Sequence, residues 1–239
     1  MKGPAQKRQK QEGHAPKIAL LHTAEVHVAT FETAFHQLRP DARLSHDIRP
    51  DLLERARREG LDAIRTEVHA ALSALADADA VLCTCSTLGP LVDECAITHR
   101  NLVRIDRALM TNACRSGPRM LVALCLESTR TATLDLLHEC AAQAGAIIDP
   151  SVVMCADAWT WFQTGDLAAY AGEIAGEIRS AISNQGPFDC VVLGQASMHV
   201  AAVGLADLPV PVLTSPEAAV EQCLAVADTI IRSLWTSGT

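Results

Sequence analysis

The sequence predicts an α/β protein made of two pseudo-symmetric lobes, each with a parallel sheet. Short apolar runs alternate with longer amphipathic stretches, which is typical of parallel strands joined by crossover helices. The segment 79–87 aligns without gaps on 189–197, an offset of 110 residues in a chain of 239. Hydrophobic residues make up 49% of the chain and aromatic residues 3%, so the core consists of Ala, Val, Leu and Ile, which suits helices packed on parallel strands.

The order of these segments predicts how the chain divides. Residues 1–16 carry four Lys and Arg residues and no apolar period, so we expect a disordered basic tail. Residues 17–112 together with 216–239 should form the first lobe, because the final helix follows the last strand and can pack back on the first half. Residues 113–215 should form the second lobe.

The first half begins with a short apolar strand, followed by a helix that ends near Leu38. A second strand is expected at 43–46, and the strand of the repeated segment at 80–84. Gly89 and Pro90 open a further helix. Between these strands, one helix face is marked by apolar residues at spacings of three and four, namely Leu61, Ile64, Val68, Leu72 and Leu75.

The second half repeats this alternation. We expect strands at 119–124, 147–148, 188–193 and 210–212, and helices at about 131–144 and 166–183. In the final helix, Ser215 is expected to cap the first turn, with Pro216 at its first position and Glu217 near its positive end. Its buried stripe is predicted from the apolar residues Val220, Leu224, Ala227, Ile231 and Leu234.

Charge and cysteine usage exclude several classes of function. The net charge of −8 and the scarcity of aromatic side chains argue against nucleic-acid binding. No apolar run approaches the ~20 residues that cross a bilayer, and no signal-peptide pattern opens the chain, so we expect a cytoplasmic protein. The nine cysteines form no C-x-x-C pair, so we expect no metal site.

Polar residues follow the predicted strands, and we expect them to line a binding cleft between the lobes. Parallel α/β sheets bind ligands beyond the carboxyl ends of their strands. Four such ends are polar, at 22–23, 85–87, 127–129 and 195–197. Hydroxyl groups in this number suit an anionic substrate. Trp159 and Trp161 stand in a connecting segment, where they either line the pocket or pack in the core.

Cys85 is the residue of this cleft with chemistry of its own. It lies where a strand gives way to a helix start, so helix-end amides are expected to lower the pKa of its thiol. A thiolate there can remove a proton beside a carbonyl group, while Ser86 and Thr87 bind a carboxylate. The alternative is a buried cysteine with capping hydroxyls, which is our reading of Cys83. On the functional reading, Cys85 should be the most reactive of the nine thiols.

These motifs resemble those of the aspartate/glutamate/hydantoin racemase superfamily. The resemblance rests on Cys85-Ser86-Thr87, on the Leu-Gly-x-x-Ser turn at 193–197, on the threonine-rich turn at 126–133 and on the lead into the last helix at 213–217. It implies a cofactor-independent enzyme with two lobes, in which one cysteine on each side of the substrate α-carbon exchanges the α-proton. Carried over by position, Cys85 is the acid/base of the first half, and Ser86 and Thr87 hold the carboxylate.

The second cysteine of that pattern is replaced here by Gln195, which does not exchange protons near neutral pH. Histidine is a common acid/base, so His22 and His199 are the candidates for the missing group, and His22 has the better position. The residues expected to bind the substrate carry hydroxyl, amide or small side chains, namely Thr23, Ser86, Thr87, Thr129, Gln195, Ala196 and Ser197.

Three functions remain open from the sequence. The first is an isomerase that transfers a proton at the carbon α to a carboxylate, as the resemblance implies. The second is a one-thiol decarboxylase or other lyase acting on a malonate-like dicarboxylate. The third is a binding protein without catalysis, in which Gln195 hydrogen-bonds the ligand. Each of them has a small carboxylate-bearing molecule as its partner, and each is compatible with a homo-oligomer.

Overall fold

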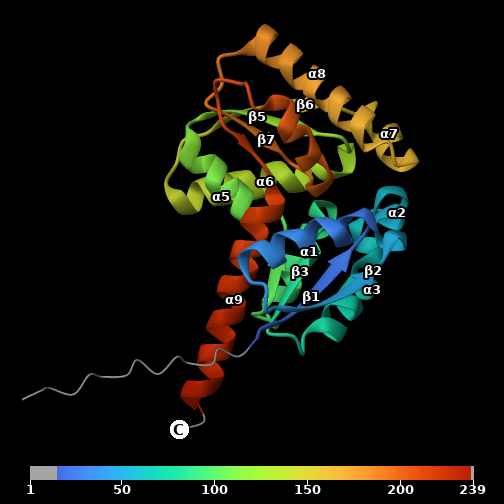
Figure 1. Cartoon of the computed structure of the whole chain (residues 1–239), viewed down its shortest axis with the longest axis vertical. Helices are drawn as coiled ribbons and strands as arrows, with labels where there is room; N and C mark the ends of the chain where they lie inside the picture. The colour runs from blue at the N-terminus through green and yellow to red at the C-terminus, as the bar shows by residue number, and fades with distance from the viewer. Residues whose placement is uncertain (1–14, 238–239) are drawn as a thin grey trace, which may run out of the picture.

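The computed structural model describes residues 15–237 and shows two α/β lobes, one above the other in Figure 1. Each lobe contains a four-stranded parallel sheet, with strand order β2-β1-β3-β4 in the first and β6-β5-β7-β8 in the second. The predicted fold class is confirmed. The expected basic tail at 1–16 lies almost wholly outside the described residues.

The first lobe is built from four strands and their connecting helices. Its elements are β1 (Lys17–His22), α1 (Val26–Leu38), β2 (Arg43–Ile48), α2 (Pro50–Glu59), α3 (Leu61–Leu75), β3 (Ala80–Cys83), the 3₁₀ helix η1 (Ser86–Leu88), α4 (Gly89–Ala96) and β4 (Leu102–Arg104).

The second lobe follows the same order of strands. Its elements are α5 (Arg107–Ser116), β5 (Arg119–Leu124), α6 (Glu127–Ala144), β6 (Asp149–Met154), α7 (Ala158–Thr164), α8 (Leu167–Gln185), β7 (Cys190–Leu193), the 3₁₀ helix η2 (Ala196–Leu205) and β8 (Val212–Leu213), after which α9 (Ser215–Ser237) ends the described chain.

The two sheets are equivalent strand by strand. Ile18 pairs with Ala80 in the first sheet as Met120 pairs with Cys190 in the second. Thr84 N–H donates to the carbonyl of Leu21, and Gly194 N–H donates to that of Ala123. The next residues, Cys85 and Gln195, are therefore structural equivalents, as the repeat predicted.

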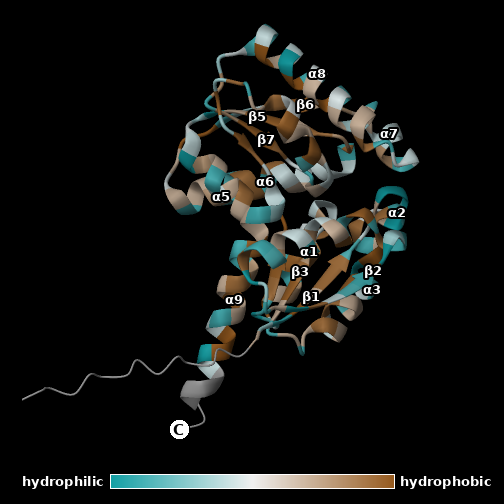
Figure 2. Ribbon diagram, viewed as in Figure 1, coloured by the Kyte–Doolittle hydropathy of each residue, from teal (hydrophilic) through white to brown (hydrophobic). Residues whose placement is uncertain are grey.

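The central strands are hydrophobic on both faces because helices cover both sides of each sheet. Every residue of β3 and β7 is buried, and the sheets are brown in Figure 2 while the outer helices carry hydrophilic faces. Burial on both faces requires such continuous apolar runs. The same runs made these strands visible in the sequence.

Helix α9 packs on the first sheet, although it follows the last strand of the second (Figure 1). Val220, Cys223 and Ala227 of α9 are buried in one cluster with Ile18 and Phe31 of the first lobe. The proposed division between residues 112 and 113 falls inside α5. Since Leu109, Met110 and Ala113 of α5 share a cluster with β5 and β7, α5 belongs with the second sheet.

Several elements differ from the sequence predictions at their ends. Helix α6 begins at Glu127 and not near residue 131, so the segment 127–129 forms its first turn. The strand expected at 147–148 is found at 149–154. Ser215 begins α9, but its hydroxyl is buried and has no hydrogen-bond partner among the described residues, so the predicted cap is wrong.

Ion pairs connect the two lobes. Arg104, at the end of β4, makes a bidentate pair with Asp106 at 2.7 and 3.0 Å and also contacts Asp93 of α4. Arg107 of α5 bridges Asp93 and Glu139 of α6, at 2.9 Å each. Within residues 15–237, no helix is long and apolar enough to cross a membrane.

Candidate active site

A small pocket, with a cavity volume of about 30 Å³, lies between the lobes at the carboxyl ends of the strands. The loops after β1, β3, β5 and β7 all reach it, together with η1, η2 and one residue each from α1, α2, α6 and α7. Its lining residues are Thr23, His27, Leu53, Thr84, Cys85, Ser86, Thr87, Leu126, Thr129, Trp159, Gln195, Ala196 and Ser197.

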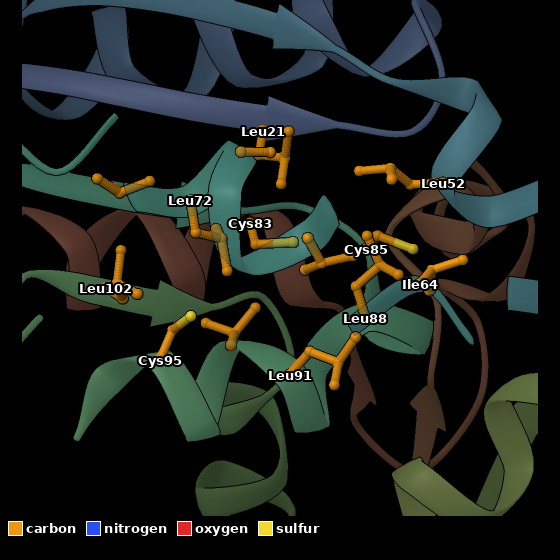
Figure 3. Packing of buried hydrophobic residues seen from close by; sticks show 14 of the residues in the cluster. Leu21, Leu52, Ile64, Leu72, Cys83, Cys85, Leu88, Leu91, Cys95 and Leu102 are labelled. Atoms are coloured by element: carbon orange, nitrogen blue, oxygen red, sulfur yellow. The ribbon is translucent and has the colours of Figure 1, made fainter. Parts of the chain in front are cut away.

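Cys85 lies two residues past the end of β3, in the extended conformation, and only 7% of it is exposed. In Figure 3 it lies beyond the strand, in a cluster with Leu88 and Ile64, whereas Cys83 lies inside the strand. This burial raises the pKa of the Cys85 thiol, although hydrogen bonds from Thr23 and from the backbone of Leu88 and Thr87 act in the opposite direction.

The predicted fall in the pKa of Cys85 is therefore wrong. The cost of burying a thiolate outweighs the stabilisation from the helix-end amides. Burial raises the pKa of the other eight cysteines as well, to about 11 for Cys125 and Cys190. The order of reactivity among the thiols thus stays a prediction.

Hydroxyl groups of the first lobe contact the second lobe directly beside Cys85. The Ser86 hydroxyl donates to the carbonyl of Gly194 at 3.2 Å. The hydroxyls of Thr87 and Thr129 lie 3.1 Å apart and share a hydrogen bond across the cleft. The structure therefore brings together the hydroxyl residues that the sequence placed at separate strand ends.

Gln195 lies opposite this group, in the position equivalent to Cys85. Its carbonyl oxygen accepts hydrogen bonds from the backbone N–H groups of Cys125 at 2.6 Å and Leu126 at 3.1 Å. Both neighbours are donors, which fixes the oxygen at that end of the amide. Next to it, the hydroxyl of Ser197 is held by the hydroxyl of Tyr170 at 2.8 Å.

His22 is not part of the pocket lining. It is fully buried behind Thr84, with Nδ1 2.9 Å from the Thr84 hydroxyl and Nε2 2.9 Å from Nδ1 of His46. Burial and the neighbouring His46 lower the pKa of His22 to about 3, so it is neutral. His199 also lies outside the lining, with Nδ1 2.8 Å from the carbonyl of Ala196.

The histidine in the pocket wall is His27, which the sequence reasoning missed. It lies in the first turn of α1 and is buried. Burial lowers the pKa of His27 to about 4, with a smaller contribution from His199. Its place in the first turn of the helix after β1 was the available signal, because such turns border the ligand site in α/β folds.

Trp159 closes the pocket from the second lobe. Its ring stacks on Phe162 at 4.7 Å between centroids, and the guanidinium of Arg57 from α2 lies 5.8 Å from the ring centroid. The facing helices α2 and α7 are seen at the right of Figure 1. Trp161 lies outside the lining and is 43% exposed. The sequence had left the choice between pocket and core open for both.

The second lobe does contain a cysteine near the pocket, but in a different place. Cys125 is equivalent to Thr23 of the first lobe, by the register of β1 and β5. Its sulfur lies 3.4 Å from the hydroxyl of Tyr170 and is not part of the lining. Among the described residues no group of His, Cys, Asp or Glu has the arrangement of a metal site.

Comparisons with known proteins establish the fold. No protein-family model matches the sequence, and neither does any curated protein. Among solved structures, the chain is similar to the aspartate racemase of Picrophilus torridus, with a TM-score of 0.70 at 12% identity over 90% of this chain and 95% of the other. It is similar to the allantoin racemase of Klebsiella pneumoniae, with 0.62 at 16% over 90% and 89%.

A mutant of arylmalonate decarboxylase is a third neighbour, with a TM-score of 0.58 at 15% identity over 89% of this chain and 94% of the other. The chain therefore has the fold of the aspartate/glutamate/hydantoin racemase superfamily, as the motifs indicated.

Proposed function

We propose that the protein is a cofactor-independent isomerase that transfers a proton at the carbon α to a carboxylate, with Cys85 as acid/base. The observation that carries this proposal is the position of Cys85. It is a thiol in the wall of an interlobe pocket whose neighbouring residues are hydroxyls and helix-start amides. The racemases among the structural neighbours support the same class of reaction.

The hydroxyls next to Cys85 have a role in this reaction. Ser86, Thr87 and Thr129 hold the substrate carboxylate and stabilise the negative charge that develops on it when the α-proton leaves. Thr23 hydrogen-bonds the sulfur and stabilises the thiolate. His22 acts through Thr84, whose hydroxyl it fixes, and not on the substrate.

His27 is the candidate for the second proton carrier in place of the absent second thiol. It lines the same pocket as Cys85. Because its pKa is lowered to about 4, it is a neutral imidazole at pH 7 and accepts a proton without first losing one. Gln195 supplies hydrogen bonds and no proton transfer.

A one-thiol lyase is the second candidate, and the protonation state of Cys85 favours it. Burial keeps the thiol protonated, and a neutral thiol is the form that delivers a proton to an enolate. Loss of carbon dioxide from a malonate-like dicarboxylate leaves such an enolate. The arylmalonate decarboxylase among the structural neighbours supports this reading.

The test is deuterium incorporation from heavy water into both enantiomers of amino acids, hydantoins and substituted malonates, followed by NMR. We expect incorporation at the α-carbon of at least one class. Cys85→Ser should reduce the rate by about 10²–10⁴, while Cys114→Ser, a half-buried thiol outside the pocket, should leave it unchanged. Carbon dioxide release would identify the lyase. Binding without exchange or release would identify a non-catalytic carboxylate-binding protein and refute both enzymes.

A further inference from the structure

Four polar side chains of the first lobe connect the pocket with the protein surface. The series begins at Thr84, which lines the pocket after β3, and crosses the sheet through His22 of β1 and His46 of β2. It ends at Glu32 of α1, whose side chain is 60% exposed, whereas Thr84 and His22 are buried. We call these four side chains the histidine network.

Three contacts join the members of the histidine network. The Thr84 hydroxyl lies 2.9 Å from Nδ1 of His22, and Nε2 of His22 lies 2.9 Å from Nδ1 of His46. Nε2 of His46 is buried, has no hydrogen-bond partner among the described residues, and lies 3.8 Å from the carboxylate of Glu32. The exposed side chain of Glu32 can shorten this distance to a hydrogen bond of about 2.8 Å. The one loose contact is therefore at the solvent end.

The hydrogen atoms of the network have two consistent arrangements. In the first, the Thr84 hydroxyl donates to Nδ1 of His22, and each histidine carries its hydrogen on Nε2, so that Nε2–H of His46 faces Glu32. In the second, the Thr84 hydroxyl donates to the carbonyl of Leu21 at 3.3 Å, and each histidine carries its hydrogen on Nδ1. A neutral imidazole has one donor and one acceptor nitrogen, so the passage of one proton converts the first arrangement into the second.

The pocket needs a route for protons because its titratable groups are shielded from bulk water. Cys85 and His27 are each 7% exposed, and a cavity of about 30 Å³ has room for about two water molecules. Burial keeps the Cys85 thiol protonated, so Cys85 must lose that proton before it acts as a base. In the alternative lyase, the thiol must regain a proton after each turnover.

We propose, on the basis of the proposed function, that the histidine network carries protons between the pocket and solvent. On the way out, Cys85 gives the proton of its S–H bond to a water molecule in the pocket and becomes a thiolate. That water passes one of its protons to the Thr84 oxygen, and the Thr84 proton moves to Nδ1 of His22. The Nε2 proton of His22 moves to His46, and the Nε2 proton of His46 moves to Glu32, which releases it to solvent. The reverse shift brings a proton in.

The shift through the two histidines is concerted. Burial and the neighbouring His46 lower the pKa of His22 to about 3, so His22 does not hold a second proton at pH 7. It accepts a proton on one nitrogen while it releases another from the second nitrogen. His46 acts through His22 and Thr84, and it does not line the pocket.

Exchange of the His22 ring N–H with heavy water tests the path without any substrate. NMR of isotope-labelled histidine measures the rate in wild type and in His46→Phe, which keeps a ring beside His22 and removes both nitrogens. We expect exchange to be slower in the variant by about tenfold or more. If His46 served only the fold, its loss would loosen the sheet and accelerate the exchange. His36→Phe changes an exposed histidine of α1 and, as the matched control, should leave the rate unchanged.

Turnover tests the connection to Cys85, in the deuterium assay of the proposed function. His46→Ala should lower kcat by about tenfold or more and leave KM unchanged. Imidazole added to the buffer should restore kcat of this variant and have no effect on wild type. Thr84→Val removes the hydroxyl and should lower kcat without rescue by imidazole, whereas Thr84→Ser keeps the hydroxyl and should retain the wild-type kcat.

Several outcomes would overturn the proton path. They are unchanged or faster His22 exchange in His46→Phe, a wild-type kcat in His46→Ala, and a lost activity that imidazole does not restore. If the His46 variants do not fold, Thr84→Val decides, and a wild-type kcat in that variant would overturn the path.

The path and the proposed reaction fail independently. Slow His22 exchange in His46→Phe, together with no turnover of any substrate by wild type, would refute the proposed enzyme and retain the path. Turnover by wild type, together with unchanged His22 exchange in His46→Phe, would retain the enzyme and refute the path.

Discussion

Asp79 and Asp189 occupy equivalent positions in the two lobes, and each accepts a hydrogen bond from the first backbone N–H of its sheet's central strand. The distances are 2.7 Å from Lys17 and 2.8 Å from Arg119. Their own N–H groups donate to the carbonyls of those two residues. At the end of the sheets away from the pocket, the two lobes thus have the same backbone hydrogen bonds and the same side-chain hydrogen bond.

At the pocket end the lobes differ. The first lobe presents Thr23 and Cys85 where the second has Cys125 and Gln195, and it buries His22 where the second has Leu124. The titratable side chains of the pocket, Cys85 and His27, therefore both come from the first lobe, and the second lobe contributes none. The duplicated backbone determines where the pocket forms, while its side chains differ: the first lobe contributes the thiol of Cys85 and the imidazole of His27, and the second contributes the amide of Gln195 and the indole of Trp159.

The largest effect that this comparison predicts comes from the buried ion pair of the first lobe. Arg104 and Asp106 correspond to Thr214 and Pro216 in the second lobe, by the equivalence of β4 and β8. Arg104→Met leaves the fully buried Asp106 carboxylate without its bidentate partner. We expect a loss of about 3–5 kcal/mol in the free energy of unfolding, measured by urea denaturation.

Two variants control for the size of that change. Arg115→Met removes an exposed arginine and should cost less than about 0.5 kcal/mol. Arg104→Met combined with Asp106→Leu removes both charges and should recover most of the stability. A double variant as unstable as the single one would mean that the pair itself, and not the orphaned charge, stabilises the fold.

The second effect is acid sensitivity confined to the first lobe. The pKa of His22 falls from 6.5 to about 3 on folding and that of His27 to about 4, so the unfolded chain binds protons more readily below pH 6.5. Both histidines are neutral in the folded and in the unfolded chain above pH 6.5, so they do not lower the free energy of unfolding there. As the pH falls from 6.5 toward 4 and 3, protonation of the unfolded chain lowers the free energy of unfolding. One such histidine loses about 2 kcal/mol by pH 5.

Hydrogen exchange measured at pH 7 and pH 5 locates this loss. Amides of β1 and β3 should lose protection at pH 5 relative to those of β5 and β7, where Leu124 replaces His22. His22→Asn keeps a hydrogen-bond donor for Thr84 and removes the titrating imidazole. It should therefore reduce the loss of amide protection between pH 7 and pH 5. Equal loss of protection in both lobes would contradict the assignment to His22 and His27.

The fold was predictable because its signals are local and duplicated. The inner strands predicted at 80–84 and 188–193 are found at 80–83 and 190–193, and the helix face predicted from Leu61 to Leu75 lies on α3. The segment 127–129 was misread as a strand-end loop, because Ser and Thr favour loops and helix starts alike. Tertiary packing of α6 decided between them.

The position of the candidate site was predictable from the sequence, but the protonation state of its residues was not. Strand ends identified Cys85, Thr87 and Gln195, since the topology brings them to one edge. The protonation of Cys85 was not predictable, because it depends on burial by residues distant in sequence, such as Ile64. His22 also looked favourable by position alone. Its contact with His46 of β2 arises only in the folded sheet, and His22 is not among the residues that line the pocket.

The smallest predicted effect tests the symmetric part of the comparison. Asp79→Ala and Asp189→Ala each remove a hydrogen bond to a backbone N–H, and since both aspartates are half-buried, each should cost about 1 kcal/mol in the free energy of unfolding. Asp77→Ala, an exposed neighbour of Asp79, should change it by less than about 0.5 kcal/mol. The two half-buried sites lie in different lobes, so the double variant should lose the sum of both. If the double variant loses less than the sum of the single variants, or if only one single variant loses stability, the two equivalent hydrogen bonds do not contribute equally and independently to the free energy of unfolding.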